Sequence, residues 1–485
     1  MSQSSTQPKA PVGNRILSLS ERSTDGSLLA SVYRGREEKW IDMLYGKKSW
    51  NYWVKIETDY ITSHRHRIKT RVRKGIPDSI RRCAWIALTG AGKLKAANHG
   101  RYRALLSLPI YSNSTIIDIS LWGVGPTCPG AVDANSILHL VPQPDTPASR
   151  SVFDTIERDV TRTFTRTAFF SDAIGQAKLF RVLVAFAQHD PVVGYCQGMA
   201  FVTALLVSFL GNDEEDVFWM LCSMMHSPVL DLAGLYKPGL PQVGKHLHIL
   251  VGLLNTLRPK LGASLQANGI HVSMYASQWI LTIFTYSFPL PWVARIFDSF
   301  LWEGWKTVYR VAVAVLIVFE TPLLAAKSLE EIMCIFKLIP ETLAGKDGLK
   351  YMPNATGLTD KSHLISNGGV GMANILKLMP TFDGTENDIN TLMEGAFKLK
   401  FYQKDIQALT REYEALVNSR CETCGINAGC ILRKTGISEL PKEAQVAYLE
   451  TLSRTKHDGK IIPTSQEERA ITPSYRPSIA SWGKT

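Results

Sequence analysis

Apolar residues recur at helical spacing through most of the chain. The pattern begins near Trp40 and runs almost without a break from Phe153 to about Leu343. Spacings of three and four residues place such side chains on one stripe of an α-helix. No convincing run of alternating apolar and polar residues predicts a β-strand, and no internal repeat is found. The pattern therefore predicts an all-α fold.

Stretches without this periodicity divide the chain. Residues 1–35 are rich in Ser, Thr and Gly and are expected to form a disordered tail. Residues 36–344 are expected to form the main helical domain, with a loop or insertion at about 110–150 that is rich in Ser, Pro, Gly and Asn. The remaining segments are predicted as a loop-rich linker at 345–395, a C-terminal helical segment at 396–455 and a second disordered tail at 456–485.

The C-terminal segment contains one clearly amphipathic stretch, from Phe401 to Val417. Its apolar residues follow a 3-4-3 spacing, which suits either a helix docked on the main domain or a short coiled-coil seam. These residues are Ile406, Leu409, Tyr413 and Leu416.

Two uncharged stretches approach the length of a membrane span, Pro191–Asn212 and His271–Ala294. Both contain Gly, Gln or Pro, and neither has a clear Lys/Arg asymmetry at its ends. They are predicted to be buried helices of a large core, and a multi-pass membrane protein is the alternative. The first fifteen residues lack the apolar core of a signal peptide. We therefore expect a cytoplasmic protein with reduced cysteines.

The net charge of the 485 residues is +11, which favours an acidic partner such as nucleic acid, anionic lipid or an acidic protein face. Much of the charge lies in a basic run from His64 to Lys74. Such a run is either a solvated helix face or a contact for an anionic surface. No known nucleic-acid reader motif accompanies it, so charge alone suggests a nucleic-acid binder.

Cysteine offers no clear site. Cys421, Cys424 and Cys430 supply three soft ligands where zinc normally takes four, so metal binding there stays open. Cys196 has His189 nearby in sequence but no third group to orient a base, so thiol catalysis is not favoured.

The first candidate site is an arginine on a one-sided helix. Arg162 lies roughly opposite the apolar stripe of its predicted helix, and Asp159, three residues earlier, can reach its guanidinium. The helix is thus expected to bury one face and to present an arginine braced by a carboxylate. The stripe consists of Phe153, Ile156, Val160 and Phe164.

The second candidate site is the segment from Gly194 to Met199. Asp190-Pro191 looks like a helix cap followed by the first helical position, which predicts an apolar helix running to about Leu210. Tyr195 and Gln197 would then lie near the start of that helix, where side chains emerge at a surface. The glycines beside them would allow another chain to approach closely.

These residues resemble the signatures of a known family. Ile156 to Thr163 resembles the IxxDxxRT signature of TBC domains, the GTPase-activating domains that act on Rab-type GTPases, and Tyr195 to Gly198 resembles their YxQG signature. Further segments are similar to the family in the same order along about residues 70 to 340. They are Arg73–Trp85, Gln278-Trp279, Arg295-Ile-Phe-Asp298, Phe300–Gly304 and Val308–Phe319.

The resemblance has one local departure. The family usually follows its arginine with Phe-Pro and then His, whereas here Phe164 is followed by Thr165, Arg166 and Thr167. The departure leaves Arg166, and more weakly Arg158, as other candidates for the key arginine.

The resemblance implies a fold of two helical subdomains and an activator of GTP hydrolysis in vesicle trafficking. It implies that Arg162 and Gln197 are the catalytic residues supplied in trans to a Rab-type GTPase in its GTP form, and that Asp159 and Tyr195 support them. GTP and magnesium would belong to the GTPase, so no cofactor is expected. The protein would meet organelle or vesicle membranes peripherally, through the GTPase. The alternative is a catalytically inactive Rab effector or scaffold.

Overall fold

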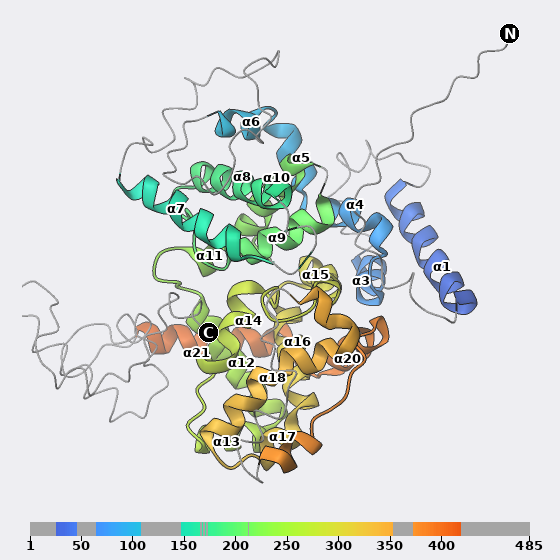
Figure 1. The fold of residues 1–485 in the computed structure, drawn as a ribbon, viewed down its shortest axis with the longest axis vertical. Helices are drawn as coiled ribbons and strands as arrows, with labels where there is room; N and C mark the ends of the chain where they lie inside the picture. Colours follow the sequence, from blue (N-terminus) through green and yellow to red (C-terminus); the bar gives the residue numbers. More distant parts are fainter. Residues whose placement is uncertain are drawn as a thin grey trace, which may run out of the picture.

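The computed structural model describes residues 26–45, 65–107, 147–164, 167, 170, 173–211, 213–352 and 372–418. Helices are the regular elements of these ranges, so the expected all-α fold is confirmed there. The helices form two groups, one above the other in Figure 1.

The first group surrounds α8, α9 and α10, which pack on one another, with α5, α6 and α7 outside them. Aspartate caps one of these helices, since the Asp213 side chain accepts a hydrogen bond from Glu215 N at the start of α10. The group consists of α4 (Asp78–Thr89), α5 (Ala91–Ala97), α6 (Arg101–Leu106), α7 (Pro147–Arg162), α8 (Ala173–His189), α9 (Met199–Leu210), α10 (Glu214–His226) and α11 (Ala233–Tyr236).

The second group is built on α12, α15 and α16, and α14 joins it to α9 of the first group. The helix α3 (Arg65–Lys74) packs on α15, and α4 contacts both groups. The group consists of α12 (Val243–Leu257), α13 (Pro259–Ala267), α14 (Ser273–Thr282), α15 (Leu290–Glu303), α16 (Trp305–Val318), α17 (Glu320–Ala325) and α18 (Leu329–Gly348), followed by the short 3-10 turn η5 (Leu349–Tyr351).

Both stretches that approach membrane-span length are core helices interrupted by turns. In the first, the helix α9 covers only Met199–Leu210, and most of its residues are buried. In the second, α14 ends at Thr282 and α15 begins at Leu290. Within the part of the chain that the structure describes, no helix combines the length and apolarity that a bilayer crossing requires.

The N-terminal helix α1 spans Gly26–Tyr45, so it begins inside the segment expected to be a disordered tail. That boundary at residue 35 is corrected. The helix packs on α4, and Trp40 and Met43 are buried. Both buried residues lie in the second half of the helix, near the point where the apolar pattern recognised in the sequence begins.

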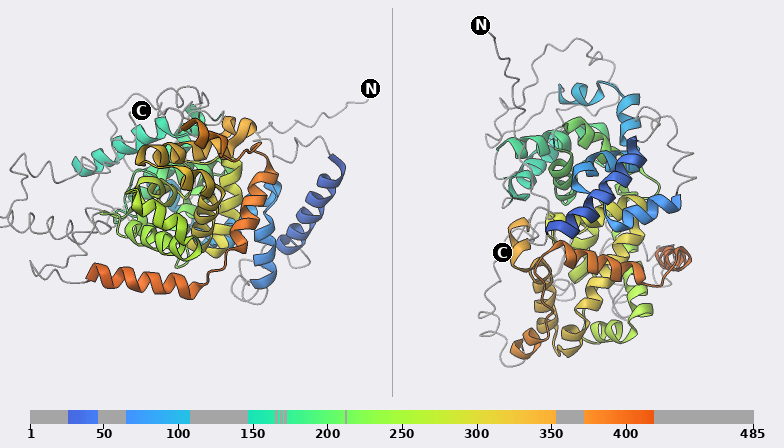
Figure 2. Two further views of the ribbon diagram at one scale, coloured as in Figure 1. Left: turned by 90° about the horizontal axis from the view of Figure 1, so that it is seen from below. Right: turned by 90° about the vertical axis from the view of Figure 1, so that its right-hand side faces the viewer.

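The C-terminal helices cover the second group. The helix α20 (Glu386–Lys398) packs on α15 and α16, and residues 372–377 are also helical, so helix occupies part of the segment expected to be a loop-rich linker. The helix α21 (Gln403–Asn418) docks along α12, which settles the choice against a free coiled-coil seam. Figure 2 shows α21 as a separate outer rod against this group.

Small residues on α12 permit this docking. A Cβ atom placed on Gly252 would collide with Leu409, and one placed on Gly244 would collide with the ring of Tyr413. Ile406 and Tyr413 are buried in the contact, whereas Leu416 is exposed. Several predicted segments lie outside the described residues. They are residues 1–25 of the expected tail at 1–35, most of the insertion, residues 419–455 of the expected helical segment with Cys421, Cys424 and Cys430, and the expected tail at 456–485.

Candidate functional site

The helix α7 buries one face and exposes the other, as its spacing predicts. The four residues of its apolar stripe are at most 4% exposed, whereas the Arg162 side chain is 39% exposed. The buried face packs on α8 and α9. The stripe therefore holds α7 in place while Arg162, its last residue, remains at the surface.

The chain after Arg162 turns sharply. Phe164 has a φ of +55°, which is unusual for a residue with a large side chain. Its ring is fully buried and makes edge contacts with Phe170 and Phe201. Thr163 and Thr167 close the turn through hydroxyl bonds to the carbonyls of Asp159 and Phe164. Burial of this ring compensates for the strained backbone directly beside Arg162.

Asp159 joins the two candidate segments. Its Oδ1 accepts a hydrogen bond from Arg162 Nη2 at 2.6 Å, and its Oδ2 accepts one from the Tyr195 hydroxyl at 2.6 Å. Its side chain is only 6% exposed. The carboxylate thus orients the arginine of α7 and fastens the segment that carries Gln197 to the same helix.

The segment before α9 differs from the expected helix start. The helix begins at Met199, so Tyr195 and Gln197 lie in a turn and not within the helix. Asp190 does act as a local cap, but its Oδ1 accepts from the backbone N–H groups of Val192 and Val193, which closes a turn at the end of α8.

Two glycines define the turn. Gly194 and Gly198 have φ values of +60° and +107°, which residues with a Cβ rarely adopt. They postpone the helix that Asp190 and Pro191 predict from sequence. The two glycines therefore set the backbone conformation of the turn that carries Tyr195 and Gln197.

Burial shapes the acidity of the groups around Asp159. Burial raises the pKa of Asp159, although the hydrogen bond from Tyr195 and the charge of Arg162 oppose that rise. Burial and the neighbouring carboxylate raise the pKa of Tyr195 well above its ordinary value. The same two causes raise the pKa of the Cys196 thiol to about 11. The tyrosine therefore stays a hydrogen-bond donor at neutral pH, and Cys196 stays a thiol and a poor nucleophile.

The other candidate arginines are placed differently. Arg158 is exposed on α7, where its guanidinium bonds to the Asp154 carbonyl and lies 3.4 Å from the Thr155 hydroxyl. Arg166 lies outside the described residues. Arg162 is thus the candidate that the structure brings to the turn of Gln197.

No sequence pattern pointed to His226, which contacts the turn that carries Gln197. Asp190 also contacts His226, whose Nε2 lies 2.9 Å from Asp190 Oδ2. The pair ties the end of α10 to the turn that carries Gln197. A contact between residues so far apart in the chain leaves no local spacing pattern, which is why sequence reasoning missed it.

The described residues hold no cluster of three or more His, Cys, Asp or Glu side chains arranged for a metal ion. The chemistry of this site therefore rests on an arginine, a glutamine, a tyrosine and one carboxylate. Such a set can stabilise negative charge and orient a polar molecule.

Comparison with known proteins identifies the region that contains the site. Residues 141–324 match the sequence profile of the Rab-GTPase-TBC domain. A human protein, the ecotropic viral integration site 5 protein homolog, is 36% identical over 192 residues, which are 39% of this chain and 23% of that protein. The Rab GTPase-activating protein eat-17 of Caenorhabditis elegans is 40% identical over 162 residues, which are 33% of this chain and 18% of that protein.

A solved structure is also similar. The crystal structure of the Chlamydomonas flagellar RabGAP TBC domain aligns with a TM-score of 0.48 and 23% identity, covering 76% of this chain and 93% of its own. The two curated relatives are much longer proteins, since the match spans only about a fifth of each. The matched residues 141–324 include both Arg162 and Gln197. This region of the chain, residues 141–324, therefore matches the Rab-GTPase-TBC domain, the family whose two signatures the sequence resembles.

Proposed function

We propose that this protein is a GTPase-activating protein for a Rab-type GTPase and that it supplies Arg162 and Gln197 in trans. The observation that carries the proposal is the double hydrogen bond of Asp159, which holds the arginine helix and the glutamine turn together. The match of the surrounding region to the Rab-GTPase-TBC domain supports the partner class.

Arg162 suits the stabilisation of phosphoryl charge. Hydrolysis of GTP develops negative charge on the γ-phosphoryl oxygens and on the oxygen that bridges the β and γ phosphorus atoms. A guanidinium is planar and permanently charged, so it can donate to two such oxygens at once. Asp159 holds one terminal nitrogen of this guanidinium, Nη2, in a defined position before the GTPase arrives.

Gln197 suits the orientation of the attacking water. Its amide carries both a donor and an acceptor, so it can hold a water molecule in line with the γ-phosphorus atom. Tyr195 acts as a positioning residue, because its bond to Asp159 fixes the turn. GTP and magnesium belong to the GTPase in this scheme. This chain contributes side chains and no cofactor, and meets membranes peripherally through its partner.

Single-turnover GTP hydrolysis on a panel of Rab-type GTPases tests the proposal. The unsubstituted protein is expected to accelerate hydrolysis by at least one GTPase of the panel. Acceleration of none, combined with GTP-dependent binding of one, would instead establish a non-catalytic effector or scaffold.

Replacing Gln197 with alanine is expected to slow the accelerated hydrolysis about 10²-fold, because the attacking water loses its orientation. Affinity for the GTPase should change little, since the side chain acts on the reaction. Stopped-flow hydrolysis and equilibrium binding measure the two quantities. Gln266→Ala, at an exposed position of α13, is the matched control and should retain full activity. Equal activity of the two variants would rule out the role of Gln197.

Replacing Tyr195 with phenylalanine removes a hydroxyl that donates to a carboxylate, an interaction of about 1.5–3 kcal/mol. The maximal rate of hydrolysis is therefore expected to fall roughly tenfold to a hundredfold. Tyr102→Phe is the control, since the Tyr102 hydroxyl also donates to a carboxylate, Glu214, but belongs to α6. If both variants lose the same activity, Tyr195 acts through general stability and not through the turn.

A further inference from the structure

The basic helix α3 is only partly a solvated face. Ile68 and Val72 are buried and hold the helix on α15. Arg73 makes a two-pronged ion pair with Glu303, while Arg65 and Lys69 remain exposed. The helix therefore combines a structural arginine with cations that face water.

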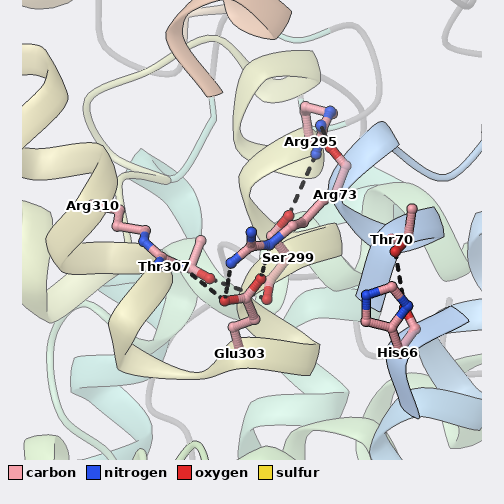
Figure 3. Close-up of polar contacts among 8 residues, drawn as sticks. All are labelled: His66, Thr70, Arg73, Arg295, Ser299, Glu303, Thr307 and Arg310. Atoms are coloured by element: carbon pink, nitrogen blue, oxygen red, sulfur yellow. Dashed lines mark hydrogen bonds and ion pairs between the residues drawn. The ribbon is translucent and has the colours of Figure 1, made fainter. Parts of the chain in front are cut away.

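Glu303 is shared between two arginines, as Figure 3 shows. Its Oε2 accepts from Arg73 Nη2 at 2.8 Å and from Arg310 Nη1 at 2.8 Å. Burial alone would raise the pKa of Glu303, but the neighbouring cations Arg73, Arg310 and Lys69 outweigh it and lower that pKa. One buried carboxylate thus serves two guanidinium groups and cannot neutralise both.

Further cations surround this pair. Burial lowers the pKa of Lys306, and the positive charges of Arg310, Lys69 and Arg73 lower it further against the opposing effect of Glu303. Arg310 is 8% exposed in its side chain, and its Nε has no hydrogen-bond partner among the described residues. The positive charge here is therefore only partly compensated by the residues that the structure describes.

An exposed aromatic ring lies among the lysines. Tyr402 is 60% exposed, and its ring centroid lies 6.0 Å from Lys306 Nζ and 5.9 Å from Lys404 Nζ. The Asp405 carboxylate accepts a hydrogen bond from the Tyr402 backbone N–H. Tyrosine flanked by lysines is typical of the boundary between a bilayer and water, where the ring sits among headgroups.

We propose that the cationic face formed by Lys69, Lys306 and Lys404 around Tyr402, and backed by the Arg73–Glu303–Arg310 group, docks the protein directly on an anionic membrane surface, in addition to the contact that the GTPase provides. Phospholipid headgroups supply the counter-charge that Glu303 and Asp405 do not. The face belongs to α3, α16 and the start of α21, whereas Arg162 is the last residue of α7 in the first group of helices. The face and the Asp159 site share no residue.

A membrane is favoured over nucleic acid by the arrangement of aromatic groups. Single-stranded nucleic acid is usually held by several aromatic rings on which successive bases stack. The contacts around Lys306 and Lys404 include one well-exposed ring, Tyr402, while Phe401 is buried.

Flotation of the full chain with vesicles tests the proposal. Vesicles of phosphatidylcholine with phosphatidylserine are expected to bind the protein, and vesicles of phosphatidylcholine alone are not. Replacing Lys69, Lys306 and Lys404 with alanine should weaken binding by roughly a hundredfold, since each lysine near an anionic surface contributes about fivefold. Binding should also fall as salt is raised.

Two matched variants complete the experiment. Lys260→Ala/Lys327→Ala/Lys337→Ala removes the same charge from exposed positions elsewhere and should bind like the parent. Lys69→Arg/Lys306→Arg/Lys404→Arg keeps the charge and should also bind. Equal binding by both alanine variants would overturn the proposal, and so would tighter binding to a DNA duplex than to anionic vesicles. No GTPase is present, so the result is independent of the proposed activation of GTP hydrolysis.

Discussion

Replacing Arg162 with alanine is expected to reduce the acceleration of GTP hydrolysis by about 10³- to 10⁵-fold. The substitution removes the charge that would neutralise the γ-phosphoryl group in the transition state. Lysine in its place should restore little, because a single ammonium cannot donate to two oxygens from one plane. Single-turnover hydrolysis on the responsive GTPase measures the loss.

The structure offers a close control in Arg158→Ala. Arg158 lies on the same helix, one turn earlier, and bonds to backbone and hydroxyl groups of α7 itself. The Arg158→Ala variant should retain full acceleration of GTP hydrolysis. Stability should hardly change in Arg158→Ala, because the contacts of Arg158 are exposed and local. Arg162→Ala removes one of the two partners of the buried Asp159 carboxylate, so circular dichroism checks that this variant is folded. Full activity of Arg162→Ala would contradict the assignment and direct attention to Arg166.

Replacing Asp298 with alanine is expected to lower the free energy of unfolding by about 3–5 kcal/mol. Asp298 is fully buried on α15 and accepts hydrogen bonds from Ile76 N, Arg81 Nε and Trp85 Nε1 at 2.8, 3.1 and 2.9 Å. Without the carboxylate, the buried guanidinium of Arg81 keeps its bond to the Ile76 carbonyl and its contact with the partly exposed Asp78, but it loses its buried counter-charge. Urea unfolding followed by circular dichroism measures the change.

Asp42→Ala is the control for this prediction. Asp42 also pairs with an arginine, Arg67, but at 4.0 Å and with its side chain 71% exposed. Its removal should cost less than about 1 kcal/mol, because water already screens the pair. Equal midpoints for the two variants would show that Asp298 does not stabilise the contact between α4 and α15.

Local patterns account for what the sequence predicted well. The stripe of α7 and the pair of Asp159 with Arg162 depend on neighbours three or four residues apart, and both are present in the structure. The catalytic roles of Arg162 and Gln197 stay predictions, since geometry alone does not measure a rate.

The sequence could not predict contacts between segments that lie far apart in the chain. The bond from Tyr195 to Asp159 and the pair of His226 with Asp190 each join residues that are adjacent only after folding. The prediction that a helix starts at Asp190 is wrong for a related reason. The capping signal is real, but it closes a turn, and the backbone conformations of Gly194 and Gly198 delay the helix.

The docking of α20 and α21 has a consequence for where the domain ends. The family profile matches only residues 141–324. However, α20 packs on helices inside that region and buries Ile389 and Met393. The helix α21 packs closely against Gly244 and Gly252 of α12, which lie inside the region as well. A fragment cut at the border of similarity would open these apolar surfaces to water and invite aggregation. The end of the profile match at residue 324 therefore does not mark the end of the packed helical unit, which extends at least as far as Tyr413.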